Sequence, residues 1–422
     1  MDSPGLKARL IEQYLKLTTQ ELKLDMSRGK PNKEQLDITA GLFNDIAVYF
    51  NRINKEKFDT GNYGLLQGIV EMKEIFSELL DVPPENIIVG GNSSLNLMYD
   101  MMSHLMLFGN QSSTQPWCRE EKVRFLCPVP GYDRHFAICE FLGMELLPVP
   151  MTKTGPDMDL VEDIVSRDAS VKGIWCVPKY SNPDGISYSD ETIRRLASMD
   201  AMAKDFRIFC DNAYLVHHLY ENDQDEILNI LDECEKAGNP DRVYVFTSTS
   251  KISFPGSGIS ALAASPGNIR NILNRLQYQT IGYNKLNMLI HARALKNKKN
   301  IEGHMSALAE VLRPKFEIVI QAFEKELQDL DFCSWNAPKG GYFISFFTLE
   351  GCAKRTVALC EKAGVKMTPA GATHPYGKDP LDSNIRIAPT FPSDEELKKA
   401  MEVFCLCVRI AAMEKMNGED WV

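Results

Sequence analysis

Short apolar runs alternate with amphipathic helical segments through the middle of the chain, and this alternation most constrains its fold. Apolar runs of strand length occur at residues 87–89, 123–127, 145–149, 173–177, 207–210 and 243–246. Helix-like segments separate them, near residues 94–107, 132–141, 190–204 and 225–236. Strands joined by such long crossovers pair in parallel. The sequence therefore predicts an α/β unit with a mostly parallel sheet sandwiched by helices.

The pattern changes after about residue 300. A long helical segment at 302–330 precedes a strand at 340–345, a helix, a short strand at 385–388 and a last helix. This order predicts a second, smaller α+β unit, as expected for a chain of 422 residues that is too long for one ordinary core.

These patterns predict two domains. We expect a large domain over residues 50–295 and a small domain formed by residues 1–49 together with 296–422. An amphipathic helix is expected at about residues 5–24, and the sequence leaves open which domain it packs on.

Composition excludes several classes of protein. The formal charge of −10 gives no attraction to nucleic acid or anionic membranes. No signal peptide or membrane-spanning run is visible, so the cytoplasm is the expected compartment. The eleven cysteines lack a C-x-x-C pair and are expected to be reduced thiols, and the seven histidines lack metal-ligand spacing.

Residues whose side chains could bind a ligand or take part in a reaction follow the predicted strands. An open α/β sheet binds its ligands at this end of the strands. The strand at 87–89 is followed by a Gly-Gly-Asn-Ser-Ser run that ends in Asn92, Ser93 and Ser94, and then by a helix. Free amides at a helix N-terminus, with glycines that allow close approach, can hold a phosphate. A serine that only caps the helix fits the same residues, so both interpretations stay open.

An aromatic ring and an amide follow the next strands. Tyr132 comes after the strand at 123–127, where its ring could stack on a planar cofactor or only pack in the core. Asn182 lies in an Asn-Pro-Asp-Gly run after the strand at 173–177. Such a run is first of all a turn, but its amide would point into the same crevice.

A carboxylate and a lysine follow the last two strands of this series. Asp211 ends a buried strand, where a carboxylate needs a cation such as a protonated pyridine nitrogen. Tyr214 is close enough in sequence to reach a phenolic oxygen on the same ring. Lys251 follows a run containing Ser248 and Ser250, and partial burial there suits imine chemistry. Taken singly, a lysine in such a position is more often a surface lysine.

A glycine pattern further on imitates a nucleotide-binding motif. Gly256, Gly258 and Ala261 fit the spacing G-x-G-x-x-A. The residues that follow are typical of a strand rather than a helix, and no acid stands about twenty residues on. We therefore expect no dinucleotide site.

Taken in order, these motifs resemble the fold-type I aminotransferases, which are pyridoxal-phosphate (PLP) enzymes. The resemblance runs from about residue 24 to about residue 397 and is closest to a bacterial-type aspartate aminotransferase subgroup. Its similar stretches are SRGKP, DNAYLVHHL, STSKI, KGGYF and TPAGATHPYGKDPLDSNIRIAPTFPS.

The resemblance implies a role for each motif residue. Lys251 would hold PLP as a Schiff base and then move the substrate proton, and Asp211 would keep the pyridine nitrogen protonated. Tyr214 and Asn182 would bind the ring oxygen O3′, and Tyr132 would stack on the ring. The residues implied to surround the phosphate are Asn92, Ser93, Ser94, Ser248 and Ser250.

The resemblance also implies substrates and an assembly. Arg386 would bind the substrate α-carboxylate through a bidentate fork, with Asn182 beside it. Gly29 and Lys30 resemble part of a substrate loop, and Arg28, Lys30 and Lys285 are candidates for binding a second carboxylate. Tyr63 resembles the tyrosine that reaches the phosphate across a dimer interface, which implies a homodimer with shared active sites. The implied reaction transfers an amino group between an L-amino acid and a 2-oxo acid, most specifically L-aspartate and 2-oxoglutarate.

The sequence departs from the family pattern in two places. No arginine stands about eight residues after Lys251, where many relatives bind the phosphate with one, and backbone amides with Ser257 are the expected substitute. Met288 and Ile290 occupy positions where the subgroup has Gln and Arg. The alternatives are another PLP reaction on this fold, such as β-elimination or decarboxylation, a PLP-binding regulator, and a silent homologue.

Overall fold

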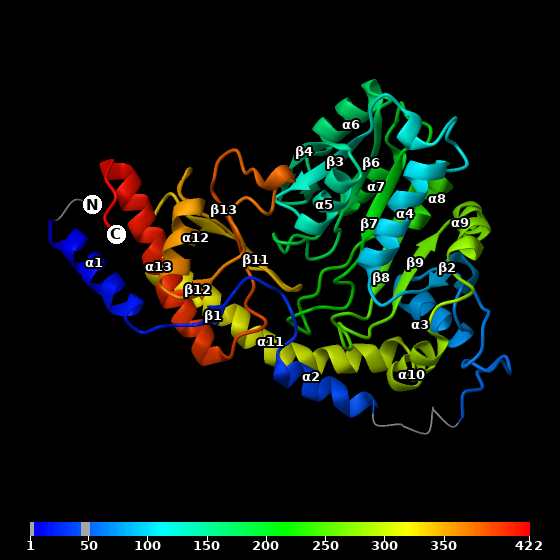
Figure 1. Ribbon diagram of the computed structural model, residues 1–422, viewed down its shortest axis with the longest axis horizontal. Coiled ribbons are helices and arrows are strands. Elements are labelled where there is room, and N and C mark those ends of the chain that lie inside the picture. The colour runs from blue at the N-terminus through cyan, green and yellow to red at the C-terminus, as the bar shows by residue number, and fades with distance from the viewer. Residues whose placement is uncertain (1–3, 44–50) are drawn as a thin grey trace.

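The computed structural model describes residues 4–43 and 51–422, and its largest element is an eight-stranded sheet (Figure 1). The strand order is β2-β9-β8-β7-β6-β3-β4-β5. Strands β8, β7, β6, β3 and β4 pair in parallel, while β9 is antiparallel to both neighbours and β5 forms a hairpin with β4. Their bounds are β2 Ile87–Val89, β3 Arg124–Val129, β4 Glu145–Thr152, β5 Gly155–Pro156, β6 Val171–Cys176, β7 Arg207–Asp211, β8 Val243–Ser248 and β9 Ser260–Ala264.

Both faces of the central strands β6 and β7 are buried, because apolar residues continue through the middle of each strand. On β6, Ile174 and Cys176 pack into one core cluster, and Trp175 between them packs into the cluster on the opposite face. On β7, Cys210 and Phe209 divide in the same way. Continuous apolar runs are typical of parallel strands covered on both faces.

Helices cover the two faces of the sheet. One face packs against α4 (Ser94–Phe108), α5 (Asp133–Phe141) and α9 (Pro266–Gln279). The helices on the other face are α3 Val70–Leu80, α6 Met158–Arg167, α7 Asp190–Ser198, α8 Ile230–Lys236 and α10 Lys285–Leu295. Within the described residues, no helix is long and apolar enough to cross a membrane. The predicted α/β architecture with a mostly parallel sheet is confirmed.

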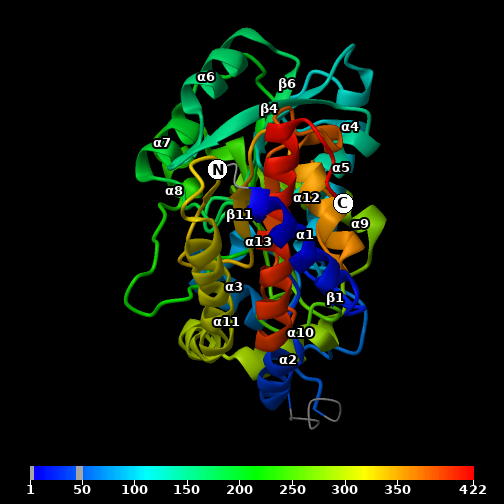
Figure 2. The same cartoon turned by 90° about the vertical axis from the view of Figure 1, so that its left-hand side faces the viewer.

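A second group of elements lies beside the sheet and has its own core. It holds the three-stranded sheet β10-β11-β13, and α1 lies against α13 (Figure 2). Tyr14 of α1 is fully buried and donates to the carbonyl of Leu359 at 2.9 Å. The bounds are α1 Pro4–Thr18, α11 Lys298–Leu327, β10 Ser334–Trp335, β11 Ile344–Phe347, α12 Ala353–Lys362, β13 Asn384–Ile387 and α13 Asp394–Asn417. The remaining segments are α2 Lys33–Ala40 and the parallel pair of β1 Leu24–Asp25 with β12 Val365–Lys366.

Three predicted helices are longer than the observed ones. The helix predicted at 190–204 ends at Ser198, and local side-chain bonds limit the other two. The first of these two ends at Thr18 rather than near residue 24, because the hydroxyls of Thr18 and Thr19 bond back to the carbonyls of Leu15 and Lys16. The helix predicted from residue 225 begins only at Ile230, after Asn229 caps it. In both cases local side-chain bonds, which periodicity does not register, set the boundary.

The division into domains at residues 295 and 296 stays a prediction. The long helix α11 contributes to both cores: Ile301 and Met305 pack with the large sheet, whereas Leu312 and Phe316 pack in the second group. The part of the predicted small domain at residues 44–49 lies outside the described residues. A boundary inside α11, rather than before it, would match this packing.

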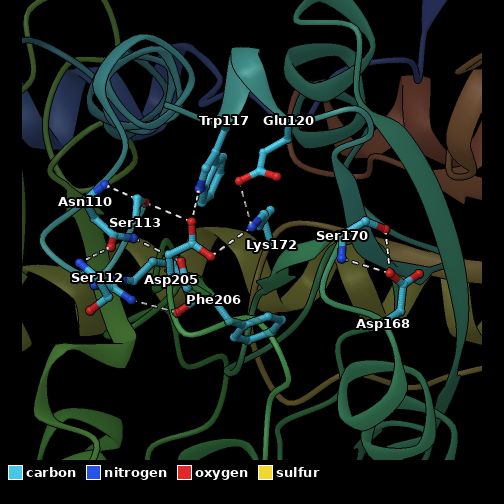
Figure 3. A network of polar contacts seen from close by, with 11 residues as sticks. Asn110, Ser112, Ser113, Trp117, Glu120, Asp168, Ser170, Lys172, Asp205 and Phe206 are labelled. Atoms are coloured by element: carbon cyan, nitrogen blue, oxygen red, sulfur yellow. Dashed lines mark hydrogen bonds and ion pairs between the residues drawn. The ribbon is translucent and has the colours of Figure 1, made fainter. Parts of the chain in front are cut away.

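A buried polar network connects three segments of the chain at the amino ends of β6 and β7 (Figure 3). Asp205 accepts from the indole of Trp117 at 2.8 Å, from the hydroxyl of Ser113 at 2.8 Å and from the amine of Lys172 at 3.0 Å. Lys172 lies 3.5 Å from Glu120. Burial opposes the charge on Asp205, but these bonds outweigh it and lower the pKa of its carboxyl.

Asp205→Ala is expected to destabilise the protein by about 3–5 kcal/mol, because it leaves the buried Lys172 ammonium paired, among the described residues, with Glu120 alone at 3.5 Å. Chemical unfolding followed by circular dichroism measures the effect. Asp163→Ala is the matched control, since it breaks an exposed ion pair of 2.6 Å with Arg167 and is expected to cost less than about 1 kcal/mol. Equal losses in the two variants would contradict the network's role.

Candidate active site

The loops after five strands meet in one cavity of about 200 Å³ at the carboxyl edge of the large sheet. Phe343, from the core of the second group, lines it together with Gly29 from the loop between β1 and α2, so the cavity lies between the large sheet and the second group. Parallel strands bring their carboxyl ends to a common edge, which explains why distant residues converge here. The predicted residues that line it are Gly29, Ser93, Ser94, Tyr132, Asn182, Asp211, Tyr214, Ser248, Ser250 and Lys251.

One wall of the cavity has the features of an anion site. Ser93 precedes α4 without making a side-chain capping bond, so the first-turn amides of Ser94 and Leu95 are left uncapped, while that of Asn96 donates to the carbonyl of Ser93 at 3.1 Å. Ser248 donates to Ser250 at 3.0 Å, and Ser250 donates to the carbonyl of Asn92 at 3.4 Å. A Cβ on Gly258 would lie 3.1 Å from that carbonyl, so the loop depends on glycine there. Hydroxyls and amides thus gather where no arginine is available.

Asp211 offers one carboxylate oxygen to the cavity. Its Oδ2 lies 3.0 Å from Nε2 of His135, and its Oδ1 has no partner among the described residues although it is buried. His135 is held in turn by stacking on Trp175, with ring centroids 4.3 Å apart and an interplanar angle of 7°. A buried, unpaired carboxylate oxygen is costly, so this position is suited to a cationic N–H of a ligand.

Lys251 brings an amine to the same cavity. Its Nζ lies 5.0 Å from the ring centroid of Tyr214 and 5.8 Å from that of Tyr342. Burial lowers the pKa of this amine, and the attraction of Asp211 opposes the shift. A lysine with a lowered pKa carries more of the neutral amine, which is the nucleophilic form.

Arg386 reaches the cavity edge from β13. Its side chain is 8% exposed, and its guanidinium lies 4.8 Å from the ring centroid of Phe343. Its Nη1 donates to Asp133 at 2.8 Å and to Asn182 at 3.4 Å, while its Nε has no partner among the described residues. This unpaired donor provides a place for a further carboxylate.

Four predicted residues are not among those that line this cavity: Arg386, which contacts the lining residues Asn182 and Phe343, and Tyr63, Lys30 and Asn92. Tyr63 is 77% exposed, and Lys30 places its amine 3.7 Å from the ring centroid of Phe391. Asn92 lines a neighbouring cavity of about 610 Å³ and contributes its carbonyl to Ser250. The predicted substitute Ser257 lines that neighbouring cavity as well.

Sequence reasoning missed four side chains of the site: His135, Trp175, Phe343 and the Asp133 partner of Arg386. His135 carried a signal, because it stands one helical turn after Tyr132 at the start of the same helix. The others became visible only once distant segments were packed together.

Asp184, in the loop that carries Asn182, predicts a pH effect on stability. Burial raises the pKa of its carboxyl to about 7, against a bond from Ser345 that lowers it. The unfolded carboxyl ionises near pH 3.8, so between these values the folded protein binds more protons and loses stability as pH rises. Asp184→Asn is therefore expected to stabilise the fold by about 1–3 kcal/mol above pH ~7 and not below pH ~4.

Urea unfolding of the cofactor-free protein at about pH 4 and about pH 8 measures this difference. A gain of the same size at both pH values would contradict ionisation as its cause. The Asp184 carboxyl of the unaltered protein and the amide of Asp184→Asn both keep an oxygen that can accept from the Ser345 hydroxyl. The comparison therefore isolates the effect of the charge.

Comparison with known proteins gives a consistent family. The profile of the aspartate amino-transferase family matches residues 2–420. An aspartate aminotransferase of Corynebacterium glutamicum is 42% identical over 404 residues, which cover 95% of this chain and 92% of that protein. The crystal structure of an aspartate transaminase from Corynebacterium glutamicum has a TM-score of 0.95 at 40% identity, with 98% of this chain and 96% of that chain covered.

A more distant likeness concerns the fold alone. The crystal structure of an α-aminoadipate aminotransferase from Thermus thermophilus, complexed with N-(5′-phosphopyridoxyl)-L-leucine, has a TM-score of 0.74 at 19% identity. The superposition covers 94% of this chain and 95% of the Thermus thermophilus chain. The chain therefore belongs to the aspartate amino-transferase family and is an aminotransferase with the fold-type I architecture.

Proposed function

We propose that the protein transfers an amino group between L-aspartate and 2-oxoglutarate, with PLP attached through Lys251. The observation that carries this proposal is the pairing, in one cavity, of a lysine with a lowered pKa and a buried Asp211 oxygen that lacks a partner. The likeness to an aspartate aminotransferase at 42% identity supports the substrate pair.

The residues of the cavity fit PLP. Lys251 would attach it, Asp211 would pair with its protonated pyridine nitrogen, and Tyr132 would stack on its ring. Tyr214 and Asn182 would bind its phenolic oxygen. Once bound, PLP supplies an electron-withdrawing ring for the electron pair of the substrate Cα–H bond. The phosphate would lie among the amides of α4 and the groups contributed by Asn92, Ser93, Ser94, Ser248 and Ser250.

The chain's own groups would then perform three tasks. Burial lowers the pKa of the Lys251 amine. This amine would take the proton from the substrate Cα and deliver it to the carbon atom of the cofactor that receives it. Asp211, braced by His135, keeps its partner nitrogen protonated. Arg386 holds the α-carboxylate by charge-assisted hydrogen bonds and so orients the Cα–H bond.

A homodimer and a cytoplasmic location are also part of the proposal. Tyr63 is exposed in the single chain, and an open cavity of about 610 Å³ lies beside the proposed phosphate site, lined in part by Asn92 and Gly258. The partner subunit's Tyr63 would complete the phosphate site from that side. This arrangement would compensate for the missing arginine after Lys251.

Lys30 is the proposed cation for the substrate's second carboxylate, because it follows Gly29, which lines the cavity. Lys30→Ala is expected to raise the KM for aspartate by about 10–100-fold, the worth of a hydrogen-bonded charge, and to leave activity toward alanine nearly unchanged. Steady-state kinetics with both amino acids measure the split. Arg28→Ala and Lys285→Ala are the matched comparisons, and equal losses of aspartate and alanine activity in Lys30→Ala would contradict the assignment.

An absorbance spectrum of the purified, PLP-loaded protein tests the proposed function. The yellow band of the lysine-bound cofactor should bleach on addition of L-aspartate and return on addition of 2-oxoglutarate. Bleaching by another amino acid alone would keep the aminotransferase and discard the substrate pair. Absence of the band after addition of PLP would overturn the cofactor assignment.

A further inference from the structure

Arg386 already holds a carboxylate of its own chain. Its Nη1 donates to Oδ1 of Asp133 at 2.8 Å, and the two residues come from different groups of elements, β13 and the start of α5. The side chain of Asp133 is 34% exposed, whereas that of Arg386 is 8% exposed. The buried arginine is thus paired with an acid that can reach solvent.

The contact between them is a single-point one. Asp133 bonds to Nη1 only, and the Nε of Arg386 remains without a partner among the described residues although it is buried. A carboxylate that engages the guanidinium at two points makes a stronger pair. An incoming carboxylate that engages the end-on fork, Nη1 with Nη2, must therefore displace Asp133 from Nη1.

Asp133 has another favourable environment close by once it leaves Arg386. It is the first residue of α5, a helix of nine residues whose N-cap, Tyr132, makes no side-chain capping bond. A carboxylate in the first turn of a helix is stabilised by the unpaired amides and the helix dipole. The displaced side chain also stays within reach of solvent, so displacement carries no cost of burying an unpaired charge.

We propose that Asp133 is an internal competitor that occupies Arg386 until a substrate α-carboxylate displaces it, and that it thereby sets the enzyme's affinity for carboxylate substrates. The proposal rests on the proposed role of Arg386 in substrate binding. A carboxylate that engages Nη1 and Nη2 must break the Asp133–Arg386 pair, and one that engages Nε and Nη2 must bind next to the Asp133 charge. Either effect weakens carboxylate binding and leaves the proposed proton-transferring Lys251 untouched.

Binding of succinate to the PLP-loaded enzyme tests the proposal, because succinate carries two carboxylates and no amino group to transfer. Its dissociation constant is measured by calorimetric titration. Asp133→Asn removes the competing charge but keeps the size of the side chain, and it is expected to tighten succinate binding by about tenfold. The KM for aspartate should fall in step, while kcat changes by less than KM does.

Two further variants serve as a matched control and as a rescue. Asp190→Asn makes the same change at the first residue of α7, where the acid pairs with exposed Arg194, and it should leave succinate binding unchanged. Asp133→Glu restores the carboxylate and should return succinate binding toward that of the unaltered protein. Thermal unfolding verifies that all variants are folded.

The outcomes separate this proposal from the proposed function. Unchanged or weaker succinate binding in Asp133→Asn would overturn the competitor role and would indicate that Asp133 orients Arg386 instead. Arg386→Lys should weaken succinate binding strongly, because it removes the bidentate fork. If it does not, Arg386 is not the carboxylate site, and the proposed substrate binding fails whatever Asp133 does.

Discussion

Lys251→Ala is expected to lower transamination by on the order of 10⁴-fold, the upper range for loss of a positioned acid–base group. The variant loses the amine that is proposed both to attach PLP and to move the substrate proton. No other lysine is among the residues that line this cavity. Steady-state kinetics with L-aspartate and 2-oxoglutarate measure the loss, and the absorbance spectrum shows whether the yellow band of the lysine-bound cofactor has gone.

A second buried lysine provides the matched control. Lys179 also has a pKa lowered by burial, to about 8, but its amine donates to the carbonyl of Leu215 at 3.0 Å and it does not line the cavity. Borohydride reduction followed by peptide mass analysis should find the cofactor on Lys251 and not on Lys179. Label on Lys179, or a yellow band that survives in Lys251→Ala, would contradict the assignment of Lys251.

The sequence predicted which residues converge where the fold itself brings them together. Asp211 and Lys251 lie on different loops, but each follows a strand of the same parallel sheet, and both line one cavity. Their convergence follows from strand direction alone, which apolar runs and helical spacers predict. The bounds of strand β2, Ile87–Val89, were also predicted correctly, because turn residues flank this apolar run on both sides.

The sequence could not predict pairings that depend on how distant elements pack. Asp133 and Arg386 are 253 positions apart, and His135 and Asp211 are 76 apart. An acid in the first turn of a helix is ordinary, so nothing local marks Asp133 as the partner of a buried arginine. Tyr63 is a different case, because its proposed role requires a second chain. In one chain its side chain is 77% exposed, and this exposure does not test the role.

Asp211 carries the second large effect, and two of its expected consequences have opposite signs. Asp211→Asn is expected to lower kcat by about 10²–10³-fold, since it removes the preorganised charge that keeps the partner nitrogen protonated. In the cofactor-free protein the same change is expected to raise stability by about 1–3 kcal/mol, because a buried oxygen without a partner no longer carries charge. Turnover kinetics and urea unfolding of the cofactor-free protein measure the two effects.

The opposite signs distinguish a functional carboxylate from a structural one. Asp205 is equally buried, but every bond it accepts comes from the chain itself, so its loss should only destabilise. Oδ1 of Asp211 is buried without a partner among the described residues, which fits its proposed pairing with a group that the chain does not supply. His135→Phe completes the comparison: it removes the bond to Oδ2 but leaves the charge, and it should lower kcat by no more than about tenfold. A cofactor-free Asp211→Asn protein that is less stable than the unaltered protein would mean that the carboxylate supports the fold, and its assignment to the pyridine nitrogen would lose its main physical argument.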